Sequence, residues 1–295
     1  MTVLGWLDKT LPQQQFHDAL FLKKREVSLL YATSARYNVF KQKRRSVSYQ
    51  LGVLNLSSDS EKLTVAVKEL ALNSGASLVG IVSARSIDSF PPVWVGWRIQ
   101  KYTLKTEEVL PNSKSLIVTG IHVWDDMLEL AIRKGDKWVY PEYFPLATLE
   151  HAIISYLEKN GFRSVSAYSL SCKRLAQLAG FGNYGKNALI TNPVYGPWIR
   201  IAPVLTTAEL VADKPFEKDL CRDCEACVKA CPVAALTPYK VDDSKCLVGI
   251  HLLDKDGFER NEQIVRYEPS FSKNAHLMCM ECQKACKYGR VRTIL

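Results

Sequence analysis

The spacing of the cysteines constrains this chain more than any other feature. Eight of the nine cysteines fall in the last quarter of the 295 residues, in two runs and one isolated position: Cys221, Cys224, Cys227, Cys231, Cys246, Cys279, Cys282 and Cys286. A chain of this length buries enough apolar surface to fold without disulfides. Two-residue gaps let three thiolates from one short loop converge on a metal centre. The pattern therefore predicts a metal-binding module at the C-terminal end.

The first run, C-x2-C-x2-C-x3-C-P, resembles that of bacterial ferredoxins, which implies two four-iron four-sulfur clusters. Zinc is the alternative, because C-x2-C pairs also form tetrahedral zinc sites. Zinc pairs rarely occur in this order, so clusters are favoured. By the cross-over typical of such ferredoxins, one cluster would take Cys221, Cys224, Cys227 and Cys286. The other would take Cys231, Cys246, Cys279 and Cys282.

The chain before the cysteines alternates helical and strand patterns, which predicts an α/β layer architecture. We expect helices near 58–73, 146–160 and 173–179, and strands near 77–83, 115–123, 165–170 and 198–206. Ser58-x-x-Glu61 is a capping-box pattern that opens the first helix. We expect three parts: an N-terminal arm or lid at 1–57, an α/β cofactor-binding domain at 58–215 and a ferredoxin-like domain at 216–295.

Composition limits the class of protein. The chain is 47% hydrophobic and 23% charged, as in globular proteins in general. We see no signal-peptide pattern at the start, and the longest apolar run, 116–124, is about half of what a bilayer requires. We therefore expect a cytoplasmic protein without a membrane partner. The net charge of +9, with basic clusters at 23–25 and 41–45, favours a solvated basic surface over a site for nucleic acid or for an acidic redox partner.

A glycine-rich stretch, 179–198, precedes the cysteines and carries a resemblance to a family. With the first cysteine run, it resembles the epoxyqueuosine reductases, which are related to the reductive dehalogenases. The resemblance implies a nitroreductase-like domain that binds cobalamin, with a cluster close to the corrin. Gly180, Gly182 and Gly185 would let the backbone approach a flat ligand, and Lys186 and Asn187 would bind cofactor amide or phosphate groups. The alternative is a plain turn between helix and strand.

The chain departs from that family at the proposed proton donor. Epoxyqueuosine reductases have an aspartate in a "V-D-S" segment, where this chain has Val165-Ser-Ala-Tyr168-Ser. The related dehalogenases are thought to use a tyrosine, so Tyr168 is our catalytic candidate. A tyrosine packed at a sheet edge is the alternative. The helical-repeat tail of many epoxyqueuosine reductases is also missing, which weakens the assignment of a tRNA substrate.

Two functions are consistent with these features. The first is an oxidoreductase that passes electrons through two clusters to cobalamin and reduces an organic substrate, either a small molecule or tRNA. A small redox protein such as ferredoxin or flavodoxin would supply the electrons. The second is an electron-transfer or corrinoid-activating protein without substrate chemistry of its own.

Overall fold

The structure is a computed structural model that describes residues 58–95, 101–123, 129–135, 137–248 and 262–289. The predicted arm or lid at 1–57 lies outside the described residues, as do the basic clusters at 23–25 and 41–45. Residues Ser58–Leu295 belong to one compact unit. Within the described residues, no helix is long and apolar enough to cross a membrane.

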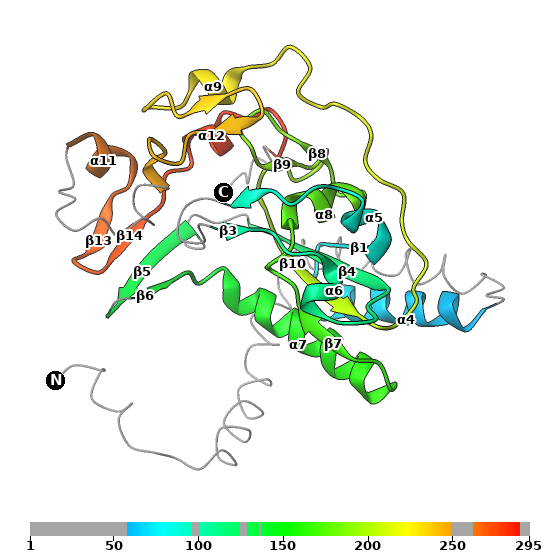
Figure 1. The fold of residues 1–295 in the computed structure, drawn as a ribbon. Coiled ribbons are helices and arrows are strands. Elements are labelled where there is room, and N and C mark those ends of the chain that lie inside the picture. The colour runs from blue at the N-terminus through cyan, green and yellow to red at the C-terminus, as the bar shows by residue number, and fades with distance from the viewer. Residues whose placement is uncertain (1–57, 96–100, 124–128, 136, 249–261, 290–295) are drawn as a thin grey trace, which may run out of the picture. The chain divides into compact units, whose positions relative to one another are not determined.

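A four-stranded sheet forms the centre of this unit, in the order β1-β4-β10-β7 (Figure 1). The strands are β1 (Leu78–Ser83), β4 (Ser115–His122), β7 (Ser164–Ser166) and β10 (Ile199–Thr206). All three pairings are antiparallel. The buried runs of β4 and β10 occupy the two middle positions, where helices cover both faces. The predicted mixed α/β architecture is confirmed.

One face of the sheet is covered by α4 (Asp59–Asn73) and α7 (Tyr143–Lys159). The predicted capping box is present in α4. The Ser58 side chain accepts a hydrogen bond from Glu61 N, and the Glu61 side chain accepts one from Ser58 N. Leu149 and Ile153 of α7 pack with Ile117 of β4 in this core. Helix α7 begins three residues before the predicted start, because its first turn continues out of a tight turn at 140–143.

The other face is covered by the short helices α5 (Ala84–Asp88) and α8 (Cys172–Leu178). Leu175 of α8 packs with Val118 and Leu205 of the sheet. The strand predicted near 165–170 ends at Ser166. The chain then turns, with Leu170 N donating to Ala167 O, before α8 begins. This turn places Tyr168 between the end of β7 and the start of α8.

A second four-stranded sheet, in the order β13-β14-β5-β6, joins the middle of the chain to its C-terminal part. Its strands are β5 (Leu130–Lys134), β6 (Lys137–Val139), β13 (Ser270–Ser272) and β14 (Ala275–Leu277). Strand β14 pairs with β5, so backbone hydrogen bonds connect residues on the two sides of the predicted boundary at 215/216.

Short elements complete the described chain. Before the cysteines these are β2 (Trp94–Val95), β3 (Lys101–Tyr102), α6 (Thr106–Val109), β8 (Asn183–Tyr184) and β9 (Ile190–Thr191). Among the cysteines they are α9 (Ala226–Lys229), β11 (Leu236–Thr237), β12 (Lys240–Val241), α11 (Glu262–Tyr267) and α12 (Glu281–Lys284). Helices α9 and α12, one from each cysteine run, contact one another. This contact brings runs that are 50 residues apart in sequence into one region.

Candidate iron–sulfur site

Four cysteines line a single cavity that opens to solvent. They are Cys221, Cys224, Cys227 and Cys286. Cys221 and Cys224 come from the loop that leads into α9, Cys227 lies in α9 itself, and Cys286 follows α12. Burial raises the pKa of the Cys227 thiol, and the neighbouring Cys221 and Cys286 raise it further. The cavity therefore contains the four thiols of the first predicted ligand set.

Thiols of the second set act on one another electrostatically. Burial raises the pKa of Cys282, and Cys246 and then Cys279 add to the effect, followed by Cys227 and Cys231. Burial also raises the pKa of Cys279, to about 11, with a further contribution from Cys246. These mutual effects require short separations. Cys282 thus has neighbours in both sets.

Zinc, the alternative to a cluster, needs ligands that lie close together. Within the described ranges, no three His, Cys, Asp or Glu side chains converge closely enough to hold a single metal ion. A zinc ion draws four thiolates to about 2.3 Å from one centre. A 4Fe-4S cluster is a larger group that also takes four cysteines.

Lys186 and Asn187 line the same cavity as the first four cysteines. Both are buried, and Lys186 Nζ lies 4.0 Å from Glu225 Oε1. The Lys186 carbonyl accepts from Tyr239 N, which ties this turn to the cysteine loops. A buried cation beside four thiolates compensates part of their negative charge. These two residues thus face the iron–sulfur cavity, and a corrin contact for them stays a prediction.

The three glycines of the same turn pack against the protein's own chain. A Cβ atom on Gly182 would overlap the backbone of Thr191, and one on Gly185 would meet the Thr191 hydroxyl. Gly180 has a φ of +81° and lies against the Lys214 carbonyl. Chain packing alone therefore accounts for glycine at these positions. A contact of these glycines with a corrin remains a prediction.

Tyr168 lies away from the cysteine cavity, with 39% of its surface exposed. Its hydroxyl donates to Glu150 Oε2 at 3.3 Å. Burial raises the pKa of Tyr168 strongly, and Glu150 adds to the effect. The Tyr143 ring meets the Tyr168 ring edge-on, with centroids 6.4 Å apart. Cys172, the ninth cysteine, lies close by, and burial raises its pKa to about 12.

Glu150, the hydrogen-bond partner of Tyr168, was not predicted from the sequence. It lies on the buried face of α7 and is 6% exposed. Burial raises its pKa, while hydrogen bonds from Ser166 and Tyr168 act in the opposite direction. A signal was available, because Leu146, Glu150, Ile153 and Leu157 follow the four- and three-residue spacing of one helical face. A carboxylate at such a position calls for an explanation.

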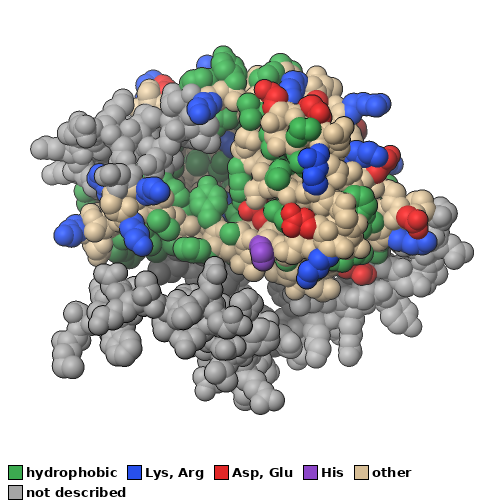
Figure 2. Space-filling model, turned by 60° about the horizontal axis from the view of Figure 1, so that its bottom comes forward, with side chains coloured by type: hydrophobic (Ala, Val, Ile, Leu, Met, Phe, Trp, Pro, Cys, Tyr) green, Lys and Arg blue, Asp and Glu red, His purple; other side chains and the backbone are tan. Residues whose placement is uncertain are grey.

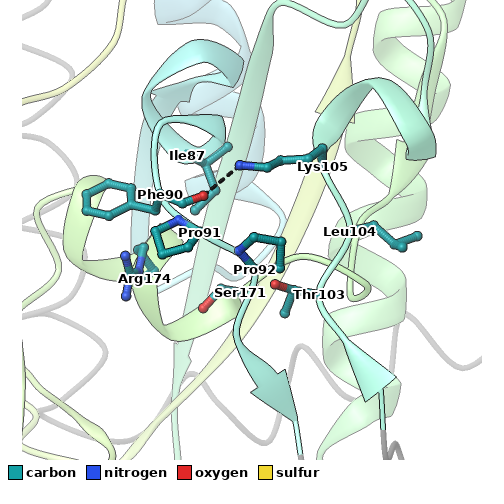
Figure 3. Close-up of a pocket in the computed structure, with 9 residues that line it drawn as sticks. All are labelled: Ile87, Phe90, Pro91, Pro92, Thr103, Leu104, Lys105, Ser171 and Arg174. Carbon is teal, nitrogen blue, oxygen red and sulfur yellow. Dashed lines mark hydrogen bonds between the residues drawn. The ribbon is translucent and has the colours of Figure 1, made fainter.

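A further cavity of about 260 Å³ lies beside α5 and α8 (Figure 3). Lys105 Nζ donates to the carbonyls of Asp88 and Phe90, and the Arg174 guanidinium lies 4.2 Å from the centre of the Phe90 ring. Lys105 and Arg174, the two cationic side chains of this cavity, thus contact other groups of the protein. Figure 2 shows basic side chains scattered over one face of the molecule with acidic ones between them, rather than gathered in one patch.

The sequence matches known proteins over most of its length. Residues 214–237 match the family described as "4Fe-4S binding domain". An epoxyqueuosine reductase of Leadbetterella byssophila is 35% identical over 244 residues, which are 76% of this chain and 78% of that protein. One of Prochlorococcus marinus is 34% identical over 79% of this chain and 80% of that protein. The match to a Synechococcus relative, at 35% identity, spans only 43% of this chain and 37% of that protein.

Solved structures share the fold. An epoxyqueuosine reductase described with an epoxyqueuosine-modified tRNA stem loop has a TM-score of 0.59 at 21% identity, over 78% of this chain and 66% of that one. A reductive dehalogenase described as B12-dependent has a TM-score of 0.56 at 19% identity, over 82% of this chain and 34% of that one. The long matches at about 35% identity decide the relationship. This chain belongs to the epoxyqueuosine reductase family.

Proposed function

We propose that this protein is a cobalamin-dependent iron–sulfur reductase that acts on an epoxide-bearing nucleoside in tRNA. The single observation that carries the proposal is the cavity lined by Cys221, Cys224, Cys227 and Cys286, with the second thiol set beside it. Each set would hold one four-iron four-sulfur cluster, which supplies transfer of single electrons. A small redox protein such as ferredoxin or flavodoxin is the proposed donor.

The ligand sets support two clusters rather than one. Four thiolates satisfy one cubane. Four of the eight cysteines line the cavity, and the other four would make up the second set. Cys282 has neighbours in both sets, so the two clusters would lie within easy electron-transfer reach of each other. The short loops that the two sets share keep this separation constant. Such a pair forms a relay with an entry side and an exit side.

Cobalamin belongs to the proposal because a protein of the same fold is described as B12-dependent. When bound, cobalamin supplies a strongly reducing cobalt that no amino-acid side chain provides. Lys186 and Asn187 face the iron–sulfur cavity instead. We therefore derive no step of the reaction through the corrin.

The substrate proposal follows from the relatives. They are named epoxyqueuosine reductases, and one structure of the same fold is described with a modified tRNA stem loop. Reduction of an epoxide consumes two electrons and two protons, whether the product is an alcohol or an alkene and water. Tyr168, whose ring is partly exposed, is the proposed proton donor to the substrate oxygen.

The test combines cofactor content with turnover. Anaerobically reconstituted protein should contain about eight irons per chain, bind added cobalamin with a change in the visible spectrum, and reduce an epoxyqueuosine-modified tRNA stem loop when given a chemical reductant. Zinc in place of iron, or no turnover of the stem loop by fully loaded protein, would contradict the proposal.

A carrier without substrate chemistry is the second candidate. Ser166 stands where the family resemblance implies an aspartate, and this is the observation that favours it. A carrier would reduce added cobalamin or a partner protein at full rate, and would leave the modified stem loop unchanged at every pH. Turnover of the stem loop by the purified chain would exclude it.

A further inference from the structure

A carboxyl group reaches the end of β7 from the neighbouring helix. Glu150 projects from α7 to the segment that contains Ser166 and Tyr168. Its Oε2 accepts from the Tyr168 hydroxyl at 3.3 Å, and its carboxylate also interacts with the Ser166 side chain. Helix α7 packs directly on β7. The position of Glu150 is therefore set by a helix–strand contact.

This is the place in the chain where the family resemblance implies an aspartate. The matching segment has Ser166 there, which cannot hold or transfer an acidic proton at neutral pH. Ser166 is one of the groups that act on the pKa of the Glu150 carboxyl. Strand β7 has no carboxyl at this position, but Glu150 of the neighbouring helix α7 places one close to it.

We propose that Glu150 is a positioning residue that orients the Tyr168 hydroxyl and replaces the proton that Tyr168 gives to the substrate. The inference rests on the proposed function, because it assigns Tyr168 as the donor. It adds a residue outside the glycine turn and the cysteines. It also explains how the chain could do without the aspartate.

The proton moves in two linked transfers. Two electrons from the proposed iron–sulfur relay break a C–O bond of the epoxide, and the Tyr168 O–H bond breaks as a new O–H bond forms on the released oxygen. Water supplies the second proton of the reduction. The phenolate oxygen then takes the proton of the neutral Glu150 carboxyl, which becomes a carboxylate. Water at the surface returns the proton to Glu150. When the Glu150 carboxyl is protonated, Glu150 becomes the donor and the Tyr168 oxygen the acceptor. The Tyr168 O–H can then point at a substrate.

Burial raises the pKa of the Glu150 carboxyl, against the hydrogen bonds that lower it. The titratable groups that interact with it are the Tyr168 phenol and the Cys172 thiol. Tyr143, which contacts the Tyr168 ring, is a further phenol. The cation of Arg200 is held by Glu129 and Glu142. A protonated carboxyl is a stronger acid than a phenol. Protonated Glu150 would therefore return a proton to Tyr168 after Tyr168 has given its own to the substrate.

The test removes the carboxyl from helix α7 and then introduces one on strand β7 by substitution. In single-turnover reduction of an epoxyqueuosine-modified tRNA stem loop by pre-reduced, fully loaded protein, Glu150→Gln should slow the reaction roughly 10- to 100-fold and flatten its pH dependence. Adding Ser166→Asp to Glu150→Gln should restore the rate to within about tenfold and bring the pH dependence back. Glu158→Gln, an exposed carboxylate of the same helix, should change neither.

Two results would overturn the inference. One is a Glu150→Gln protein with the wild-type rate and pH profile. The other is a loss that Ser166→Asp does not restore, which would assign Glu150 to packing alone. Failure of the proposed function is seen separately, as fully loaded wild-type protein that never reduces the stem loop.

A spectroscopic measurement tests the pair without turnover. Infrared spectra of the full chain should show the C=O stretch of a protonated carboxyl near neutral pH that Glu150→Gln removes and Tyr168→Phe shifts. A spectrum with no such band, or a band that Tyr168→Phe leaves in place, would reject the hydrogen-bonded pair whatever the substrate is.

Discussion

Gly196 and Gly289 lie in close backbone contact. The chain at each glycine occupies the space where the other would carry a side chain. A Cβ atom on Gly196 would overlap the Tyr288 carbonyl, and one on Gly289 would overlap the Tyr195 carbonyl. Both glycines have positive φ, +58° and +74°. Gly289 follows Cys286 by three residues, so this contact holds the last cysteine of the first ligand set against the turn that leads into β10.

Alanine at Gly289 should therefore displace Cys286. The left-handed backbone alone costs an alanine about 1–2 kcal/mol, and the overlap with Tyr195 adds to it. We expect Gly289→Ala to lower both the free energy of unfolding and the iron content of the reconstituted protein. Gly135→Ala is the control, since Gly135 has a φ of +60° with open space around it. It should show the backbone cost with full iron content, and equal iron in both variants would argue against the contact.

The two ligand sets predict two independent losses of iron. Cys224→Ala removes a thiolate from the first set, and Cys279→Ala removes one from the second. Each should lower the iron content by about half, and the electron paramagnetic resonance spectra of the two reduced variants should differ. Cys172→Ala should retain all iron, because Cys172 belongs to neither set. Complete loss in both ligand variants would mean that the clusters do not load separately.

Arg200 should be a large contributor to stability. Its guanidinium binds Glu129 and, at 2.6 Å from Nε, Glu142, and both carboxylates are buried. Arg200→Met would leave two buried charges without their cation, which costs about 3–5 kcal/mol. Lys114→Met breaks an exposed pair with Glu209 and should cost less than about 1 kcal/mol. Urea unfolding of the two variants measures the difference.

Glu150 should cost the protein stability at neutral pH. Because burial raises its folded pKa above the ordinary glutamate value of 4.5, its contribution to stability is fully present below pH 4.5 and is lost as pH rises through the folded pKa. Glu150→Gln removes this penalty and should be more stable than wild type at neutral pH, with the difference shrinking as pH falls toward 4.5. Unfolding curves across that range measure it, and a variant that is less stable at every pH would refute the assignment.

Lys186 should raise the reduction potential of the first cluster. The added electron increases the negative charge of the cluster, and a buried cation at the cavity favours that state. We expect Lys186→Met to shift the midpoint potential of this cluster to a more negative value. Lys287 lines the same cavity but is exposed, so Lys287→Met should shift it less. Equal shifts would indicate that burial at Lys186 has no effect.

Local patterns in the sequence predicted much of this protein. The capping box of α4, the buried runs of β4 and β10, and the strand and helix patterns between them involve neighbours within a few residues, and the structure confirms them. The cysteine spacing predicted a 4Fe-4S binding domain on the same ground, because one short loop supplies most of a ligand set. The match over residues 214–237 confirms that domain.

The tertiary structure decided which distant residues meet. The antiparallel order of the central sheet and the pairing of β14 with β5 depend on long-range backbone hydrogen bonds that no local period encodes. The turn at 180–187 faces Thr191 and the cysteine cavity, because its glycines allow a close approach to the chain itself. Glu150 looks like one polar residue in an apolar stripe. Only the packing of α7 on β7 places its carboxyl beside Ser166 and Tyr168.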